Sequence, residues 1–105
     1  MAFEFAARLD ELPNGTMRGV VVDGQKVLLI HVDGMIAAFE DRCQHMGVQL
    51  SQGFLEPGSL VCFLHGWEYD PLTGQSVNEP SACLQAFAVR VDEDGSIYVS
   101  VDGAE

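Results

Sequence analysis

The chain has 105 residues, which is enough for one small domain around a single core and too few for a second catalytic domain beside it. Its residues are 48% hydrophobic and include 11 glycines, an ordinary composition that excludes disordered and fibrous classes. Sixteen acidic residues against five basic ones give a net charge of −11, so we expect neither nucleic acid nor a membrane surface as a partner.

The N-terminal segment predicts a cytoplasmic protein. Glu4 lies where a secretory signal would have an apolar stretch, and no cleavage site is recognisable. The longest clearly apolar run, Val27 to Ile30, is far shorter than the roughly 20 residues that span a bilayer. Because the chain has an odd number of cysteines, three, a disulfide framework is not expected, and metal binding or catalysis is the better interpretation.

Turn dipeptides divide the chain into short strands. Four of them are flanked by β-forming residues: Asn14-Gly15, Asp23-Gly24, Asp33-Gly34 and Asp94-Gly95. They predict strands near residues 2–6 and at 16–22, 26–32, 35–40, 59–63, 86–92 and 96–101. No segment has the apolar periodicity of an amphipathic helix, so the predicted fold class is all-β.

Two longer segments, 41–58 and 64–85, interrupt this pattern with glycine and proline. Binding and catalytic residues are expected on such loops, which extend from one side of a scaffold of tight hairpins. The two segments and the strand between them contain all three cysteines and two of the three histidines. The remaining histidine, His31, lies inside a predicted strand and is interpreted as structural.

A pair of mixed motifs carries the chemistry. Cys43 and His45 form a C-x-H segment, and after sixteen residues Cys62 and His65 form a C-x-x-H segment. Each segment offers one thiolate and one imidazole to the same small volume, which predicts a metal centre held by four protein ligands. Two centres are compatible with this set: a tetrahedral zinc ion, or a two-iron cluster in which two histidines replace two cysteines.

These motifs resemble those of the Rieske-type ferredoxins, the electron carriers of bacterial multicomponent oxygenase systems. The resemblance extends over most of the chain through Leu9 to Gly15, Leu50 to Gly53, His65 to Trp67, Thr73-Gly74 and Ile97 to Val99. It implies a single domain over residues 1–105. It also implies stacked small antiparallel sheets, with one [2Fe-2S] cluster held by two loops at one tip.

The resemblance assigns the four ligands to two irons: Cys43 and Cys62 to an inner iron, His45 and His65 to an outer iron near the surface. Two ferric ions, two sulfides and two thiolates sum to zero charge, so an electron is accepted more readily than by an all-cysteine cluster. The reduction potential is therefore expected at about −150 to +300 mV rather than about −400 mV. With every iron coordination site filled, electron transfer rather than catalysis is the expected role.

Differences from the motifs of high-potential Rieske proteins indicate which subgroup of the family this chain resembles. High-potential Rieske proteins have two further cysteines, which correspond here to Val48 and Leu64, and a cluster-bonding serine, which corresponds to Trp67. Their absence favours a low-potential, oxygenase-type carrier. Tyr69 matches a tyrosine that bonds to a ligand sulfur in the high-potential group, but we favour its interpretation as a core aromatic. Cys83 is interpreted as a small buried residue, and similar ferredoxins of toluene and alkene monooxygenases have a cysteine there.

The resemblance implies a monomer that carries electrons from an NAD(P)H-dependent flavoprotein reductase to a terminal oxygenase. The sixteen-residue gap and Cys83 favour a di-iron aromatic or alkene monooxygenase over a ring-hydroxylating dioxygenase. Alternatives are a Rieske-fold subunit of a reductase such as nitrite reductase, and a structural zinc module.

An apolar cap is expected around the tip, with acidic residues beside it that suit a transient interface. The cap residues are Met46, Val48, Phe63, Leu64, Trp67 and Pro80, and the acidic residues are Glu40, Asp41, Glu68 and Asp70. Phe63 and Leu64 are expected to shield the cluster. Docking is expected near Met46, Trp67 and Pro80.

Overall fold

The computed structural model describes residues 3–43, 47–64, 66–79 and 81–101. The strands in chain order are β1 (Glu4–Arg8), β2 (Thr16–Val22), β3 (Gln25–Val32), β4 (Met35–Glu40), β5 (Phe54–Glu56), β6 (Ser59–Val61), β7 (Glu68–Tyr69), β8 (Ala86–Val91) and β9 (Ser96–Ser100). Two short 3-10 helices, η1 (Leu9–Glu11) and η2 (Leu50–Gln52), accompany them. The described residues include no α-helix, as the all-β prediction requires.

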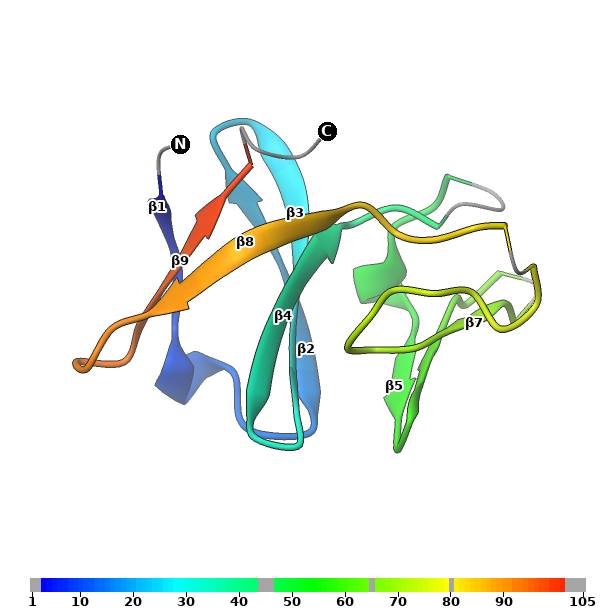
Figure 1. Cartoon of the computed structure of the whole chain (residues 1–105), viewed down its shortest axis with the longest axis horizontal. Coiled ribbons are helices and arrows are strands. Elements are labelled where there is room, and N and C mark those ends of the chain that lie inside the picture. Colours follow the sequence, from blue (N-terminus) through cyan, green and yellow to red (C-terminus); the bar gives the residue numbers. More distant parts are fainter. Residues whose placement is uncertain (1–2, 44–46, 65, 80, 102–105) are drawn as a thin grey trace.

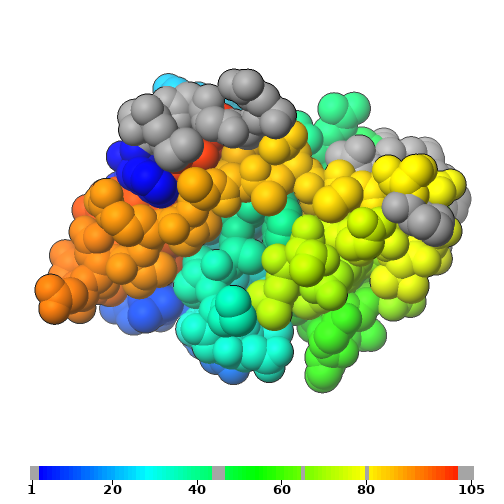
Figure 2. Space-filling model, in the orientation of Figure 1, coloured from blue at the N-terminus to red at the C-terminus, as the bar shows by residue number. Residues whose placement is uncertain are grey.

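The strands form two antiparallel sheets (Figure 1). The larger has the order β1-β9-β8-β4-β3-β2, and the smaller has the order β5-β6-β7. Because β4 and β8 pair directly, through Ala38 with Phe87 and Phe39 with Ala86, the small sheet is an insertion between two neighbouring strands of the large one. The space-filling view places this inserted unit, in green to yellow, at the end of the molecule opposite the β8–β9 turn (Figure 2).

Most of the predicted strands are confirmed, because their turns are determined locally. Asp23 and Gly24 have φ angles of 50° and 77°, and Asp33 and Gly34 have φ angles of 55° and 75°. Positive φ at both central residues is the type I′ geometry that matches the twist of a hairpin. The strand expected at residues 59–63 ends at Val61, and the one expected near residues 2–6 is β1. Strands β5 and β7 were not predicted.

The core consists of two clusters that lie on opposite faces of β3. Leu28 and Ile30 belong to the cluster beneath the small sheet, whereas Val27 and Leu29 belong to the cluster beneath β1 and β9. Successive side chains of a strand point to opposite faces, so a strand covered on both sides is apolar at every position. This explains the apolar run from Val27 to Ile30, all of which is buried.

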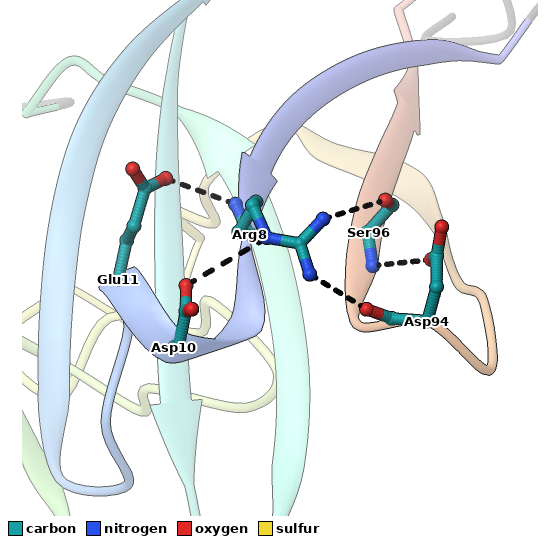
Figure 3. Close-up of polar contacts among 5 residues, drawn as sticks. All are labelled: Arg8, Asp10, Glu11, Asp94 and Ser96. Atoms are coloured by element: carbon teal, nitrogen blue, oxygen red, sulfur yellow. Dashed lines mark hydrogen bonds and ion pairs between the residues drawn. The ribbon is translucent and has the colours of Figure 1, made fainter.

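At the end of the molecule far from the small sheet, Arg8 ties β1 to the turn between β8 and β9 (Figure 3). Its guanidinium donates to the carbonyl oxygen of Asp94 at 2.8 Å and to the hydroxyl of Ser96 at 3.5 Å. Its backbone N–H donates to the carboxylate of Glu11 at 3.0 Å, which fixes η1.

Among the described residues, no helix has the length and apolar character that crossing a membrane would require.

Candidate metal centre

The first cysteine segment begins where β4 ends. The backbone N–H of Cys43 donates to the carbonyl oxygen of Val48 at 2.7 Å, and the carbonyl oxygen of Cys43 accepts from the N–H of Gly47 at 2.8 Å. Gly47 has a φ of 73°, a left-handed conformation that suits glycine. These bonds hold residues 43, 47 and 48 together, with the side chain of Cys43 completely buried.

The second cysteine segment begins where β6 ends. The N–H of Cys62 donates to the carbonyl oxygen of Trp67 at 2.8 Å, which continues the pairing of β6 with β7, and Cys62 is also completely buried. Gly53 lies against this strand so closely that a Cβ atom there would collide with the carbonyl oxygen of Val61. A glycine is therefore needed where η2 meets β6.

The structure brings Cys43 and Cys62 together as a buried pair. Both belong to the same core cluster, and neither forms a disulfide. Burial raises the pKa of the Cys62 thiol, the backbone of Leu64 lowers it through a hydrogen bond, and neighbouring Cys43 raises it through a hydrogen bond and charge repulsion. The hydroxyl of Tyr69 lies 3.4 Å from Sγ of Cys43, which is hydrogen-bond distance for sulfur.

This donor set fits a metal centre that binds thiolates. Two thiolates buried side by side are costly without a cation, because burial and mutual repulsion both favour the protonated form. A bound metal removes that cost, and hydrogen-bond donors aimed at the sulfurs stabilise the thiolates further. The backbone N–H of Leu64 is such a donor, and the hydroxyl of Tyr69 donates when Cys43 is a thiolate, because a thiolate can only accept. Tyr69 is thus both the core aromatic that we favoured and a partner of Cys43.

The predicted histidine ligands, His45 and His65, lie outside the described residues, as do the predicted docking residues Met46 and Pro80. Within the ranges that are described, no three Cys, His, Asp or Glu side chains form a group able to hold a metal ion. The described part of the centre is therefore the thiol pair and its hydrogen-bond donors.

Asp41 has a structural role at the site. The prediction that it lies on the acidic surface beside the apolar cap is wrong. Its side chain is only 3% exposed. The carboxylate accepts from the backbone N–H of Ser51 at 2.8 Å, from its hydroxyl at 2.6 Å and from the side-chain amide of Gln49 at 3.3 Å. Asp41 thus joins the two ends of the Cys43 loop.

Strand β2 passes close to this clamp at Gly19. A Cβ atom at Gly19 would lie 2.8 Å from Oγ of Ser51 and 3.0 Å from a carboxylate oxygen of Asp41. A glycine among the β-branched residues of a strand is the sequence signal for such a close approach.

Two further predictions are corrected. Cys83 is exposed rather than buried, because the adjacent Leu84 points into the core and neighbouring side chains of an extended segment alternate. Phe63 was expected to shield the cluster, but 47% of its surface is exposed.

Two residues of the predicted apolar cap lie against the core near the thiol pair, and His31 is structural, as expected. Leu64 and Trp67 are half-buried and pack against the hydrophobic core cluster that contains Cys43 and Cys62, and the ring centroids of Trp67 and Tyr69 are 6.5 Å apart. His31 lies in the large sheet, where its Nδ1 is 2.7 Å from the carbonyl oxygen of Leu12.

Comparison with known proteins gives a consistent result. A family model described as the Rieske [2Fe-2S] domain matches residues 3–88. The ferredoxin component of the alkene monooxygenase system of Xanthobacter autotrophicus is 34% identical over 95 residues, covering 90% of this chain and 77% of that protein. The ferredoxin component of the naphthalene 1,2-dioxygenase/salicylate 5-hydroxylase systems of a Ralstonia species is 34% identical over 88 residues, covering 83% and 85%.

A solved structure is similar over nearly the whole chain. It is the complex of reduced oxygenase and oxidised ferredoxin of carbazole 1,9a-dioxygenase, in which the matching chain is 28% identical with a TM-score of 0.83. The match covers 93% of this chain and 92% of that one.

Proposed function

Because this chain belongs to the Rieske [2Fe-2S] family, we propose that it is the electron-transfer ferredoxin of a multicomponent oxygenase system. In this role it is not an enzyme by itself. The observation that carries the proposal is the buried pair of Cys43 and Cys62, presented by two loops of a chain whose relatives are ferredoxin components. The [2Fe-2S] family also argues against the structural zinc module.

We propose Cys43, His45, Cys62 and His65 as the four ligands of one cluster in a single domain over residues 1–105. Bound there, the cluster accepts and releases one electron at a time. The two thiols lie inside the core, which suits ligands of an inner iron, and the histidines would then hold the outer iron. The hydrogen bonds from Leu64 and Tyr69 spread the negative charge of the sulfurs, and such donors raise a reduction potential.

The proposed partners are an NAD(P)H-dependent flavoprotein reductase, which supplies electrons, and a terminal oxygenase, which receives them. Docking near Met46, Trp67 and Pro80 would place a partner close to the histidine ligands. The net charge of −11 suits brief association with basic patches, since opposite charges accelerate encounter. In the carbazole system, the solved complex is between a ferredoxin and its oxygenase.

For the acceptor, we favour a di-iron aromatic or alkene monooxygenase. The sixteen-residue gap between the motifs and Cys83 support this choice, and one relative serves an alkene monooxygenase. Another relative with the same 34% identity serves a dioxygenase system, so a ring-hydroxylating dioxygenase is the alternative acceptor. The named relatives are ferredoxin components, which makes a subunit of nitrite reductase the weaker alternative.

Reconstitution tests the proposed function. With the reductase and oxygenase from the same cells, NAD(P)H-driven substrate oxidation is expected only when this chain is added. Undiminished turnover without it would refute the proposal.

Electron paramagnetic resonance tests the ligands, because mixed histidine and cysteine ligation lowers the average g value below that of all-cysteine clusters. We expect His45→Ala and His65→Ala to abolish this signal and His31→Ala to leave it unchanged. An all-cysteine spectrum in the unmodified protein would contradict the assignment.

A further inference from the structure

The two faces of the small sheet have opposite characters. Pairing across β5, β6 and β7, and the bridge between Tyr69 and Ser76, bring residues of adjacent strands side by side on the same face. One row is buried or half-buried and faces the core: Leu55, Leu60, Tyr69 and Ser76. The next row therefore faces outward: Phe54, Val61, Glu68 and Val77.

This outward row exposes large apolar side chains. The exposed fractions are 59% for Phe54 and 68% for Val77. Val61, which pairs with Phe54, is half-buried, and the exposed Glu68 lies between Val61 and Val77. Phe63, two residues after Val61 and 47% exposed, extends the row toward the cluster loops. We refer to Phe54, Val61, Phe63 and Val77 as the outer-face patch. Several large apolar side chains exposed on one face and absent from the core clusters typically mark a protein interaction site.

The charges around the patch have one sign. Glu56 and Glu68 are exposed on the same face, and the hydroxyl of Ser59 holds the carboxylate of Glu68 at 2.8 Å. From residue 43 to residue 89 the sequence contains no lysine or arginine. The five basic residues are Arg8, Arg18, Lys26, Arg42 and Arg90. A complementary surface therefore presents apolar side chains to the patch and basic side chains to Glu56 and Glu68.

We propose that the outer-face patch is a docking surface for the terminal oxygenase. The oxygenase would cover the patch with apolar side chains and place lysine or arginine side chains opposite Glu56 and Glu68. The proposal rests on the proposed function. It extends the oxygenase contact from the predicted docking region near Met46, Trp67 and Pro80 to the outward face of the small sheet. Phe63 directly follows Cys62, a proposed ligand. A protein bound to the patch therefore lies beside the loop that contains Cys62. A second copy of this chain is disfavoured as the occupant, since it would bring Glu56 and Glu68 against like charges.

Phe54→Ser and Val77→Ser, made singly, test the patch. Reductase and oxygenase from the same cells are titrated with each loaded variant. We expect the KM for the ferredoxin in substrate oxidation to rise about tenfold for Phe54→Ser and by less for Val77→Ser, with the same kcat, because a few large side chains carry most of the affinity of an interface and valine is seldom one of them. Reduction by the reductase and the midpoint potential should stay unchanged.

Phe5→Ser is the matched control, because Phe5 is 55% exposed but lies on β1 of the large sheet. Its KM should stay within about twofold of the unmodified protein. If the patch variants behave like this control, the docking surface is refuted. If they weaken reduction by the reductase instead, the assigned partner is wrong.

A charge variant gives a second readout. Glu56→Gln should reduce the dependence of the oxygenase KM on salt concentration, and Glu4→Gln, exposed on β1, should not. Equal salt dependence in both variants would contradict a partner that places basic side chains opposite Glu56. Failure of the unmodified protein to support any turnover would instead refute the proposed function, so the two failures are distinguishable.

Discussion

The large sheet and the small sheet are stabilised by different means. Strands β2 and β3 are 7 and 8 residues long and pair through all 7 residues of β2, whereas β5, β6 and β7 have 3, 3 and 2 residues. The inserted unit relies more on side-chain bonds to its backbone: Asn78 accepts from the N–H of Glu68, and Asp70 accepts from those of Leu72 and Thr73.

This difference shows where the metal centre contributes to stability. A unit with short strands and long loops loses much conformational entropy on folding and buries few residues that could offset this loss. The two buried thiols that we propose as cluster ligands are also the groups that burial and mutual repulsion disfavour as thiolates. Cluster binding is therefore expected to stabilise the small unit, while the large sheet has its own core around Val27, Leu29 and Val99.

The largest expected effect tests this division. Cys62→Ser removes one of the two buried thiols that we propose as ligands, so we expect loss of both iron and acid-labile sulfide. Hydrogen exchange should then accelerate in residues 50–85, while the amides of β2 and β3 stay protected. Cys83→Ser is the matched control, because Cys83 is exposed, and it should retain the full cluster. Retention of two irons in Cys62→Ser would overturn the ligand assignment.

A smaller effect is expected from Asp41→Ala, which removes the clamp across the Cys43 loop. Part-buried donors of Ser51 and Gln49 lose a charged, buried acceptor, which should lower the free energy of unfolding by about 3 kcal/mol and accelerate loss of the iron–sulfur cluster. Asp70→Ala removes a carboxylate that also accepts two backbone bonds but is exposed, so about 1 kcal/mol is expected. Urea unfolding measures both, and equal losses would contradict the clamp.

The next effect concerns the potential rather than stability. Tyr69→Phe removes a hydroxyl 3.4 Å from Sγ of Cys43, and a bond of about 1 kcal/mol corresponds to roughly 40 mV for one electron. The midpoint potential should fall by tens of millivolts in protein-film voltammetry. Tyr98→Phe, in β9 of the large sheet, is the control and should leave the midpoint unchanged. An unchanged midpoint in Tyr69→Phe would mean that the contact does not tune the cluster.

The same contrast explains what the sequence could predict. The hairpins of the large sheet depend on adjacent residues such as Asp33 and Gly34, whose turn geometry is local, so β2, β3 and β4 were predicted closely. The four proposed ligands could be picked out from the sequence because metal chemistry restricts both residue type and spacing, and the structure adds that Cys43 and Cys62 are buried together.

What the sequence could not predict depends on contacts between distant residues. Strands β5 and β7 are too short for alternation to be visible. Asp41 was predicted at the surface because its burial depends on distant residues. Its carboxylate accepts from Ser51, ten positions later, and only a glycine at position 19 leaves space for it. Cys83 points outward because its segment bridges to Gln75, a pairing that local sequence does not indicate.

The smallest effect is expected at the far end of the large sheet. The backbone N–H of Ser96 donates to the carboxylate of Asp94 at 2.9 Å and lowers the pKa of Asp94 below its ordinary value, and the hydroxyl of Ser96 and the charge of Arg8 contribute less. A carboxyl whose pKa is lower in the folded state stabilises that state above its unfolded pKa. This contribution is lost as the pH falls through the folded pKa.

Asp94→Asn should therefore destabilise the protein slightly at pH 7, and the difference from the unmodified protein should shrink as the pH falls below about 4. Unfolding by urea as a function of pH measures the difference, and an NMR titration of Asp94 gives its pKa directly. The cluster spectrum should not change, because Asp94 lies in the β8–β9 turn at the opposite end of the molecule from the inserted unit. A shifted spectrum in Asp94→Asn would show that the two sheets are coupled. A difference in stability that does not depend on pH would show that the charge of Asp94 does not stabilise this turn.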